Sequence, residues 1–313
     1  MLFPSYIPVV DVTARDGLQS LPRWIDTETK VKVIDRLSEA GYKTIEVSGF
    51  GSERALPMLK DAEQVFEQIQ RRKGVIYRGL APNAYGAKRA VFANADEIIG
   101  LTVASATYLK KNQNMDPQKA IDEAIEAFRI ADAHQKSYVV AIGMAFWCPY
   151  EGLIKPENVL EIIRQFHHAG IRKMYLAGSV GMEDPRHVNE LFARAAELYP
   201  DAAFGFHVHN LSGMGSANIL AALDAGASWL EGATCGIGGG IAMPNTLGSV
   251  GNYPCEDLVR LLEVCNVRTD LTASDALEAA KDVAAILSLE ARTHSLLGCT
   301  RQEIQKRPDQ SMS

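Results

Sequence analysis

The chain has only five cysteines among its 313 residues, and they are scattered: Cys148, Cys235, Cys255, Cys265 and Cys299. No two of them form a CxxC pair, so the sequence contains no motif for structural zinc or for thiol–disulfide exchange. An odd number of dispersed thiols also argues against a disulfide framework and is typical of a reducing compartment. These features predict a cytoplasmic protein.

Long hydrophobic runs and blocks of like charge are also absent. The longest strongly apolar stretch, residues 138–146, is far shorter than the roughly 20 residues that span a bilayer. The N-terminus has no charged start followed by an apolar leader. The 32 basic and 38 acidic side chains are spread along the chain and give a formal net charge of −6. The sequence therefore predicts neither a membrane partner nor a nucleic-acid partner.

Apolar, β-branched runs alternate with longer amphipathic stretches about eight times before residue 265. This alternation predicts βα units, whose connections imply parallel strands. Eight units are the number that closes a barrel, so we expect an α/β protein with a (β/α)8 TIM barrel. The strands are expected near residues 7–11, 43–48, 75–81, 97–103, 138–145, 172–177, 203–207 and 228–233, with a helix after each.

The helix over residues 27–40 shows the local signals. Thr27 is a candidate N-cap, Gly41 ends the helix, and the inward-facing stripe is Val31, Ile34, Leu37 and Ser38. No linker divides the chain, so we expect a catalytic barrel over residues 1–270 and a helical extension over residues 271–313 that packs on it.

An open, doubly wound sheet is the competing fold. Such sheets normally place a glycine-rich phosphate-binding turn after the first strand, but here residues 11–17 read DVTARDG. Charged residues stand where glycines would be expected, which favours the barrel.

Polar residues at the carboxyl ends of barrel strands are candidates for catalysis. His207 and His209 alternate along one strand, so both imidazoles face the same side and could bind one ion, although the HxH pattern also fits a pair of core histidines. Asp16 would add a carboxylate and Asn252 a carbonyl oxygen. This mixed nitrogen and oxygen set suits Mg²⁺ or Mn²⁺ better than structural zinc.

Arg15 follows the first strand and Glu46 lies in the second. Adjacent charges such as Arg15 and Asp16 are often no more than a surface ion pair. At the mouth of a barrel, however, a guanidinium can stabilise a carbonyl oxygen that gains enolate charge. Glu46 is costly to bury alone, so it either pairs with a cation such as Arg15 or faces the cavity.

Two segments are candidates for covering a substrate. Residues 235–248 form a long glycine-rich loop that lacks the GxGxxG spacing and the P-loop lysine, so it fits a mobile lid or a merely flexible loop better than a nucleotide site. Residues 147–152 line a cleft or form a turn with a packed aromatic ring.

Taken together, the motifs resemble the 3-hydroxy-3-methylglutaryl-CoA lyase branch of the metal-dependent TIM-barrel lyases and acyl-CoA condensing enzymes. The resemblance runs from about residue 7 to residue 292. It rests on the motifs RDGLQ (15–19), LSEAG (37–41), IE (45–46), PN (82–83), KKN (110–112), CPYEG (148–152), HVH (207–209), GN (251–252) and EDLV (256–259).

The resemblance implies a divalent cation, Mg²⁺ or Mn²⁺, held by Asp16, His207, His209 and Asn252. Arg15 would stabilise an enolate with Glu46 supporting it. The implied reaction is a retro-aldol or retro-Claisen cleavage of a 3-hydroxyacyl-CoA or a related 3-hydroxy acid, with the CoA thioester as substrate rather than resident cofactor. The positions expected to contact the substrate are Gln19, Ser105, Tyr150, Gly178, Ser179 and Gly240.

The chain departs from the lyase pattern at three places. Gly240 stands where those lyases carry a proton-donating cysteine, and Cys235 is a candidate replacement whose alternative is packing. Residues 177–179 read AGS where the lyases have a Gly-Asp-Thr turn, so a carboxylate is missing at Gly178. Asn210 replaces an aspartate, as in the condensing relatives. Gly178 and Gly240 also leave volume for a bulkier or differently charged acyl group.

Three functions follow. The first is a metal-dependent carbon–carbon lyase that has diverged in substrate. The second is a synthase that joins an acetyl-CoA enolate to a 2-oxo acid, although the Gly-Glu-Arg motif of that branch is missing. The third is a metal-binding scaffold without catalysis. The sequence leaves the acyl group, the direction of reaction and any association with a second copy of the chain open.

Overall fold

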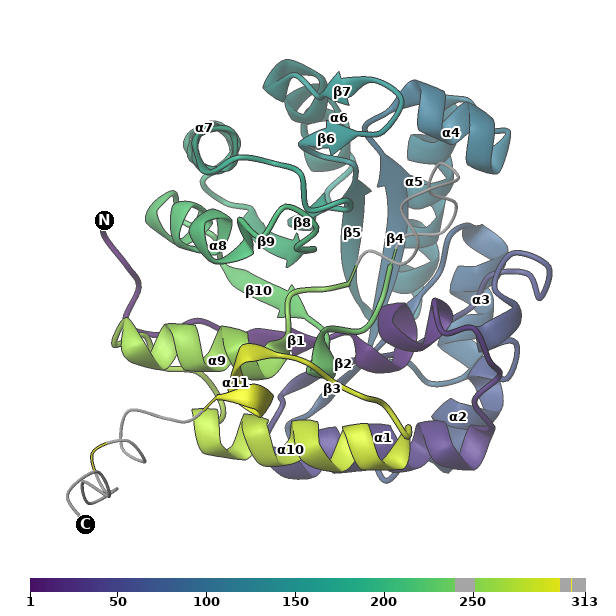
Figure 1. Cartoon of the computed structure of the whole chain (residues 1–313). Helices are drawn as coiled ribbons and strands as arrows, with labels where there is room; N and C mark the ends of the chain where they lie inside the picture. Colours follow the sequence, from purple (N-terminus) through teal and green to yellow (C-terminus); the bar gives the residue numbers. More distant parts are fainter. Residues whose placement is uncertain (240–250, 299–304, 306–313) are drawn as a thin grey trace, which may run out of the picture.

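The computed structural model describes residues 1–239, 251–298 and 305 of the chain. Within these residues, eight parallel strands form a closed barrel in the order β1-β10-β9-β8-β5-β4-β3-β2 (Figure 1). The predicted barrel is confirmed, and each predicted strand range overlaps one of its strands. The bounds are β1 (Val9–Asp11), β2 (Thr44–Gly49), β3 (Ile76–Leu80), β4 (Glu97–Val103), β5 (Ser137–Gly143), β8 (Lys173–Gly178), β9 (Ala203–Val208) and β10 (Trp229–Gly232).

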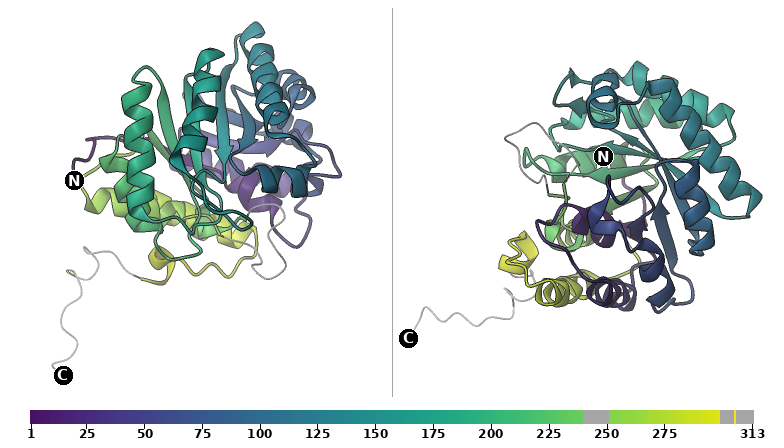
Figure 2. Two further views of the ribbon diagram at one scale, coloured as in Figure 1. Left: turned by 90° about the horizontal axis from the view of Figure 1, so that it is seen from above. Right: turned by 90° about the vertical axis from the view of Figure 1, so that its right-hand side faces the viewer.

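Helices cover the outside of the barrel, as two further views show (Figure 2). No helix in the described ranges is both long and apolar enough to cross a membrane. The bounds are α1 (Thr27–Ala40), α2 (Ala62–Gln68), α3 (Ala84–Phe92), α4 (Ala106–Gln113), α5 (Pro117–Ala133), α6 (Pro156–His168), α7 (Pro185–Leu198), α8 (Gly215–Asp224), α9 (Cys255–Val264), α10 (Ala273–Ile286) and α11 (His294–Leu297).

Short elements occupy several of the connections. A π-helical turn η1 (Thr13–Gly17) follows β1, and 3-10 turns η2 (Pro57–Leu59) and η3 (Thr234–Gly236) follow β2 and β10. The segment after β5, considered from sequence as a cleft lining or a turn, forms an antiparallel hairpin of β6 (Trp147–Cys148) and β7 (Gly152–Leu153).

The strand sequences separate the core into two layers. In β8, Tyr175 and Ala177 belong to the cluster inside the barrel, whereas Met174 and Leu176 belong to the layer between the strands and the helices. This alternation follows from the two-residue period of a strand. Because both faces of each strand are packed, the carboxyl ends that carry the polar side chains are held firmly.

The start of α1 differs from the prediction. Asp26, rather than Thr27, is the N-cap, because its carboxylate accepts the N–H of Thr29 at 2.9 Å. The Thr27 hydroxyl instead donates to Asp61 at 2.7 Å. Val31 is half-buried and Val33 is buried, so the inward-facing stripe is also shifted at this end of the helix.

The described part of the C-terminal segment lies against the first helix. Figure 1 and Figure 2 show α10 beside α1, and Gly41, which ends α1 with a φ of +116°, lies against Leu271. A capping box between Thr272 and Asp275 starts α10. The division of the chain at residue 270 stays a prediction.

The carboxyl end of β8 is covered by Glu183, which lies in the loop before α7. The side chain is 1% exposed, and neither carboxylate oxygen makes a hydrogen bond of normal geometry to any described residue. A Cβ atom added at Gly178 would lie 2.1 Å from Oε1 of Glu183. The space above Gly178 is therefore filled, which contradicts the prediction that this glycine leaves room for a larger acyl group.

We expect Gly178→Ala to lower the free energy of unfolding by about 1–3 kcal/mol, because the added methyl group forces a buried carboxyl group to move within a packed interior. Denaturant unfolding of the variant measures this loss. The double variant with Glu183→Ala removes the overlap and should be more stable than Gly178→Ala alone. Equal stability of Gly178→Ala and the natural chain would show that Glu183 has room to move.

Candidate active site

Three of the predicted metal ligands meet at the carboxyl ends of the strands. Asp16 comes from η1, His207 from β9, and His209 follows directly after β9. One potential ligand atom from each lies within 4.8 Å of the others, and all three side chains are buried. Segments almost 200 residues apart in the sequence thus converge on one point because β1, β10 and β9 are neighbours in the barrel.

The two imidazoles face each other. Nε2 of His207 lies 3.2 Å from Nε2 of His209, and Nε2 of His209 lies 3.8 Å from Oδ2 of Asp16. Two ring nitrogens and a carboxylate oxygen directed at a common point are a donor set that divalent cations accept.

Asn252 completes the predicted set. It forms a β-bridge with His209, and its amide nitrogen donates to Oδ2 of Asp16 at 2.7 Å and to the carbonyl of Ile237 at 3.0 Å. Its oxygen, Oδ1, is buried and has no hydrogen-bond partner in the described part of the chain. A buried carbonyl oxygen left unsatisfied beside a carboxylate fits a ligand to a hard cation.

Arg15 joins the cation site to Glu46. Its Nε and Nη2 atoms donate to the two carboxylate oxygens of Glu46 at 2.6 and 2.9 Å, and its Nη1 donates to Oδ1 of Asp16 at 2.6 Å. The pairing expected for buried Glu46 is therefore present. This geometry fixes the guanidinium beside the point where the three ligands converge.

Arg15 also keeps Asp16 ionised. Burial opposes the charged form of Asp16, but the positive charge of Arg15, the two histidines and the amide of Asn252 outweigh it and lower the pKa of Asp16 to about 2. The side chain is thus a carboxylate at any physiological pH.

The ion pairs inside the barrel leave an excess of negative charge. Four carboxylates oppose three cations, which leaves one uncompensated negative charge when both histidines are neutral. The carboxylates are Asp16, Glu46, Glu97 and Glu231, and the cations are Arg15, Arg78 and Lys173, whose side chain is 47% exposed at the start of β8. A bound cation would reverse this imbalance, so the electrostatics of the interior favour one.

The roles of Gln19, Tyr150 and Ser179 as substrate contacts stay predictions, and the structure describes their local contacts. Gln19 follows η1, and its Oε1 is buried without a partner among the described residues. The Ser179 hydroxyl accepts the N–H of Met144 at 2.9 Å just past the end of β8. The Tyr150 ring lies under the ammonium of Lys111, at 4.3 Å.

Ser105, a predicted substrate contact, and Cys235, a predicted proton donor, both make hydrogen bonds within the protein. Ser105 is fully buried, caps α4 through the N–H of Tyr108, and donates to Glu151 at 2.9 Å. The Cys235 thiol donates to the carbonyl of Ala280 at 3.3 Å, toward α10, and burial raises its pKa well above the ordinary value. The structure therefore gives Ser105 a capping role and does not bring the Cys235 thiol to the three ligands.

The remaining positions are Gly178 and Gly240. Gly178 ends β8, where Glu183 fills the space beside it. Gly240 lies outside the described residues, as does most of the predicted lid.

The sequence analysis missed several polar side chains near the site. Glu231 and Arg78 lie inside the barrel, and the Tyr175 ring stacks on His207 with centroids 5.6 Å apart. Burial, together with the charges of Tyr150, Cys148 and Asp16, raises the pKa of Tyr108 to about 12. Arg78 and Glu231 could have been found from the sequence, because each is a charged residue within an otherwise apolar strand.

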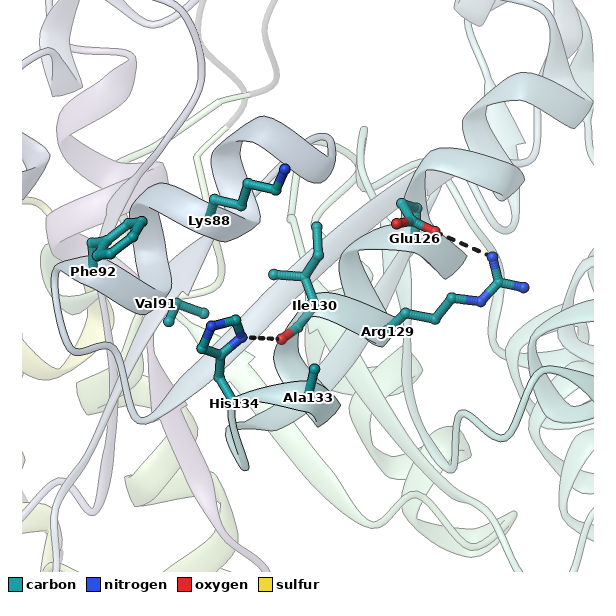
Figure 3. Close-up of a pocket in the computed structure, with 8 residues that line it drawn as sticks. All are labelled: Lys88, Val91, Phe92, Glu126, Arg129, Ile130, Ala133 and His134. Atoms are coloured by element: carbon teal, nitrogen blue, oxygen red, sulfur yellow. Dashed lines mark hydrogen bonds and ion pairs between the residues drawn. The ribbon is translucent and has the colours of Figure 1, made fainter.

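A surface groove lies away from the candidate active site. Figure 3 shows it between α3 and α5 in the outer layer of helices, where Nδ1 of His134 lies 2.8 Å from the carbonyl oxygen of Ile130 and forms a hydrogen bond with it. It contains none of the converging ligands. The residues that line it are Lys88, Val91, Phe92, Glu126, Arg129, Ile130, Ala133 and His134. The groove is therefore separate from the candidate active site.

Comparisons with known proteins agree with the resemblance. A mitochondrial hydroxymethylglutaryl-CoA lyase of Homo sapiens is 34% identical over 279 residues, which cover 88% of this chain and 84% of that protein. A cytoplasmic 3-hydroxy-3-methylglutaryl-CoA lyase of Mus musculus is 33% identical over 279 residues, covering 88% and 80%. Relatives from both compartments match, so the cytoplasmic location stays a prediction.

A solved structure matches almost the whole chain. It is an HMG-CoA lyase from Acinetobacter baumannii in complex with coenzyme A and 3-methylmalate, with a TM-score of 0.90, 31% identity, and coverage of 98% of this chain and 100% of that chain. The prediction of a carbon–carbon lyase similar to hydroxymethylglutaryl-CoA lyase is confirmed by these relatives. The sequence model of the HMGL-like family matches residues 6–283, and the chain belongs to that family.

Proposed function

We propose that the chain cleaves a carbon–carbon bond of a 3-hydroxyacyl-CoA, with a divalent cation bound at the carboxyl end of the barrel. One observation carries this proposal: Asp16, His207 and His209 converge within 4.8 Å, directly beside the Arg15–Glu46 pair. The names of the relatives supply the substrate class, and the similar bacterial structure contains coenzyme A.

Mg²⁺ or Mn²⁺ fits the donor set. Asp16, His207, His209 and the unsatisfied Oδ1 of Asn252 would hold it, and no thiolate takes part. Oxygen-rich sites with some imidazole suit these ions. When bound, the cation supplies Lewis acidity that makes the substrate hydroxyl a stronger acid.

Arg15 acts on the other half of the substrate. As the carbon–carbon bond breaks, its electron pair passes to the thioester carbonyl, whose oxygen becomes an enolate oxygen. A guanidinium fixed by Glu46 can donate to that oxygen without reorganising, so it stabilises the transition state more than the substrate. The hydroxyl proton leaves to a base, and a second proton later quenches the enolate carbon.

Gln19, Tyr150 and Ser179 are proposed to contact the substrate. The buried oxygen of Gln19 needs a donor, which a substrate hydroxyl would supply. Lys111 above the Tyr150 ring adds positive charge at the edge of this region, where the anionic groups of a CoA thioester would be attracted.

The synthase hypothesis remains a second candidate, supported by Asn210, the residue shared with the condensing relatives. Asn210 accepts the N–H of Gly215 at 2.8 Å at the start of α8, a bond that an aspartate could accept as well. The scaffold hypothesis remains the alternative in which a cation binds but no bond is cleaved.

A turnover assay tests the proposal. The enzyme is incubated with Mg²⁺ or Mn²⁺ and with 3-hydroxy-3-methylglutaryl-CoA or other 3-hydroxyacyl-CoAs, and the products are followed by mass spectrometry. We expect metal-dependent cleavage of at least one thioester into a shorter acyl-CoA and a ketone, and no cleavage with a chelator. Silence across the panel, with the metal bound, would instead support the scaffold.

Arg15→Met should lower kcat about 100-fold or more, because it removes the donor to the enolate oxygen. Metal affinity should change much less, because Oδ2 of Asp16 still faces His209 and Asn252. Arg36→Met is a matched control, since Arg36 pairs with Asp282 on the outer helices. Full activity of Arg15→Met would exclude the proposed role.

A further inference from the structure

Glu231 lies inside the barrel beside one of the proposed metal ligands. It belongs to β10, is fully buried, and is paired in register with His207 of β9. Its two carboxylate oxygens have different partners. One faces His207, and the other accepts hydrogen bonds from Arg78 and Trp229.

The first oxygen controls the imidazole. Oε2 of Glu231 lies 3.1 Å from Nδ1 of His207, and the other ring nitrogen, Nε2, points toward His209 at 3.2 Å. A carboxylate can accept but not donate a hydrogen bond, so this contact places the proton of a neutral His207 on Nδ1. Nε2 then presents its lone pair to the point where the ligands converge.

The second oxygen fixes the carboxylate itself. Oε1 accepts Nη1 of Arg78 at 2.8 Å and Nε1 of Trp229 at 2.7 Å. These two donors come from β3 and from β10 itself, so the carboxylate cannot rotate without losing both bonds.

Arg78 is held in turn from the opposite end of the barrel. Its Nε donates to Glu97, the first residue of β4, and Glu97 also accepts Nζ of Lys173 at 2.9 Å. Lys173 begins β8. The chain of contacts therefore runs through the barrel interior, from the amino ends of the strands to His207 at their carboxyl ends.

We propose that Glu231 is a positioning residue of the metal site, which sets the tautomer and the orientation of His207 through Nδ1. Arg78 and Trp229 keep Glu231 in the geometry that this task requires. The inference rests on the proposed function only in that the two histidines bind a cation; it does not depend on which substrate is cleaved.

Glu231→Gln reverses the hydrogen bond without changing the size of the side chain. Arg78 and Trp229 offer donors only, so the amide oxygen turns toward them and the NH₂ group faces His207. Nδ1 must then accept, the proton moves to Nε2, and the lone pair toward the metal is lost. We expect Mn²⁺ affinity to fall about 10- to 100-fold, the usual cost of removing such a partner.

Two measurements test the proposed role of Glu231, and both are made without substrate. Titration with Mn²⁺, followed by electron paramagnetic resonance, gives the affinity. Nitrogen-15 NMR of the metal-free protein, which has 7 histidines, reports which ring nitrogen of His207 carries the proton. With spectra recorded at alkaline pH, where the imidazole is neutral, the expected result is Nδ1–H in the natural chain and Nε2–H in Glu231→Gln.

Asp61→Asn is the matched control. It removes a buried carboxylate that pairs with Lys30, outside the network of Glu231, and that has no contact with His207 among those described. We expect it to lower the melting temperature and to leave Mn²⁺ affinity within about twofold. An Nε2–H tautomer in the natural chain, or equal Mn²⁺ affinity of Glu231→Gln and the natural chain, would overturn the inference. Failure to cleave any thioester, with the tautomer as expected, would instead count against the proposed function alone.

Discussion

Buried charge needs a partner, and this constraint organises the interior of the barrel. A carboxylate loses its hydration inside a protein and is stable there only when cations or hydrogen-bond donors replace the water. Glu46 and Asp16 share Arg15, while Glu231 and Glu97 share Arg78. Arg15 thereby joins η1 to β2, and Arg78 joins β3 to β4 and β10, so these contacts form only when the barrel closes.

The metal site lies where this pairing is incomplete. Arg15 satisfies one oxygen of Asp16, and the other oxygen faces His209 and Asn252. The interior carries more negative than positive charge, and the Oδ1 atom of Asn252 is unsatisfied within the described residues. A divalent cation would resolve both features, and it would do so beside the guanidinium proposed to stabilise the enolate. The proposed metal ligand Asp16 and the guanidinium of Arg15 thus lie side by side in one set of ion pairs.

Much of this was predictable from the sequence, because the relevant signals are local or periodic. The alternation of strands and helices predicted the barrel, and polar residues at strand ends predicted that Asp16 and His207 would meet. The errors arose where a distant residue decided the outcome. Gly178 leaves no space because Glu183 fills it, whereas the N-cap of α1 was missed by one residue, since the adjacent Asp26 caps the helix and Thr27 binds the distant Asp61. Glu231 was missed since two of its three partners, Arg78 and His207, come from other strands.

Anomalous X-ray diffraction from crystals grown with Mn²⁺ is the most direct test of the metal site on which this mechanism depends. The proposal requires one strong peak within bonding distance of the Asp16 carboxylate and the Nε2 atoms of His207 and His209, with Oδ1 of Asn252 beside it. A peak elsewhere in the barrel, or no peak at a concentration of Mn²⁺ that supports turnover, would contradict the assignment of these residues as ligands.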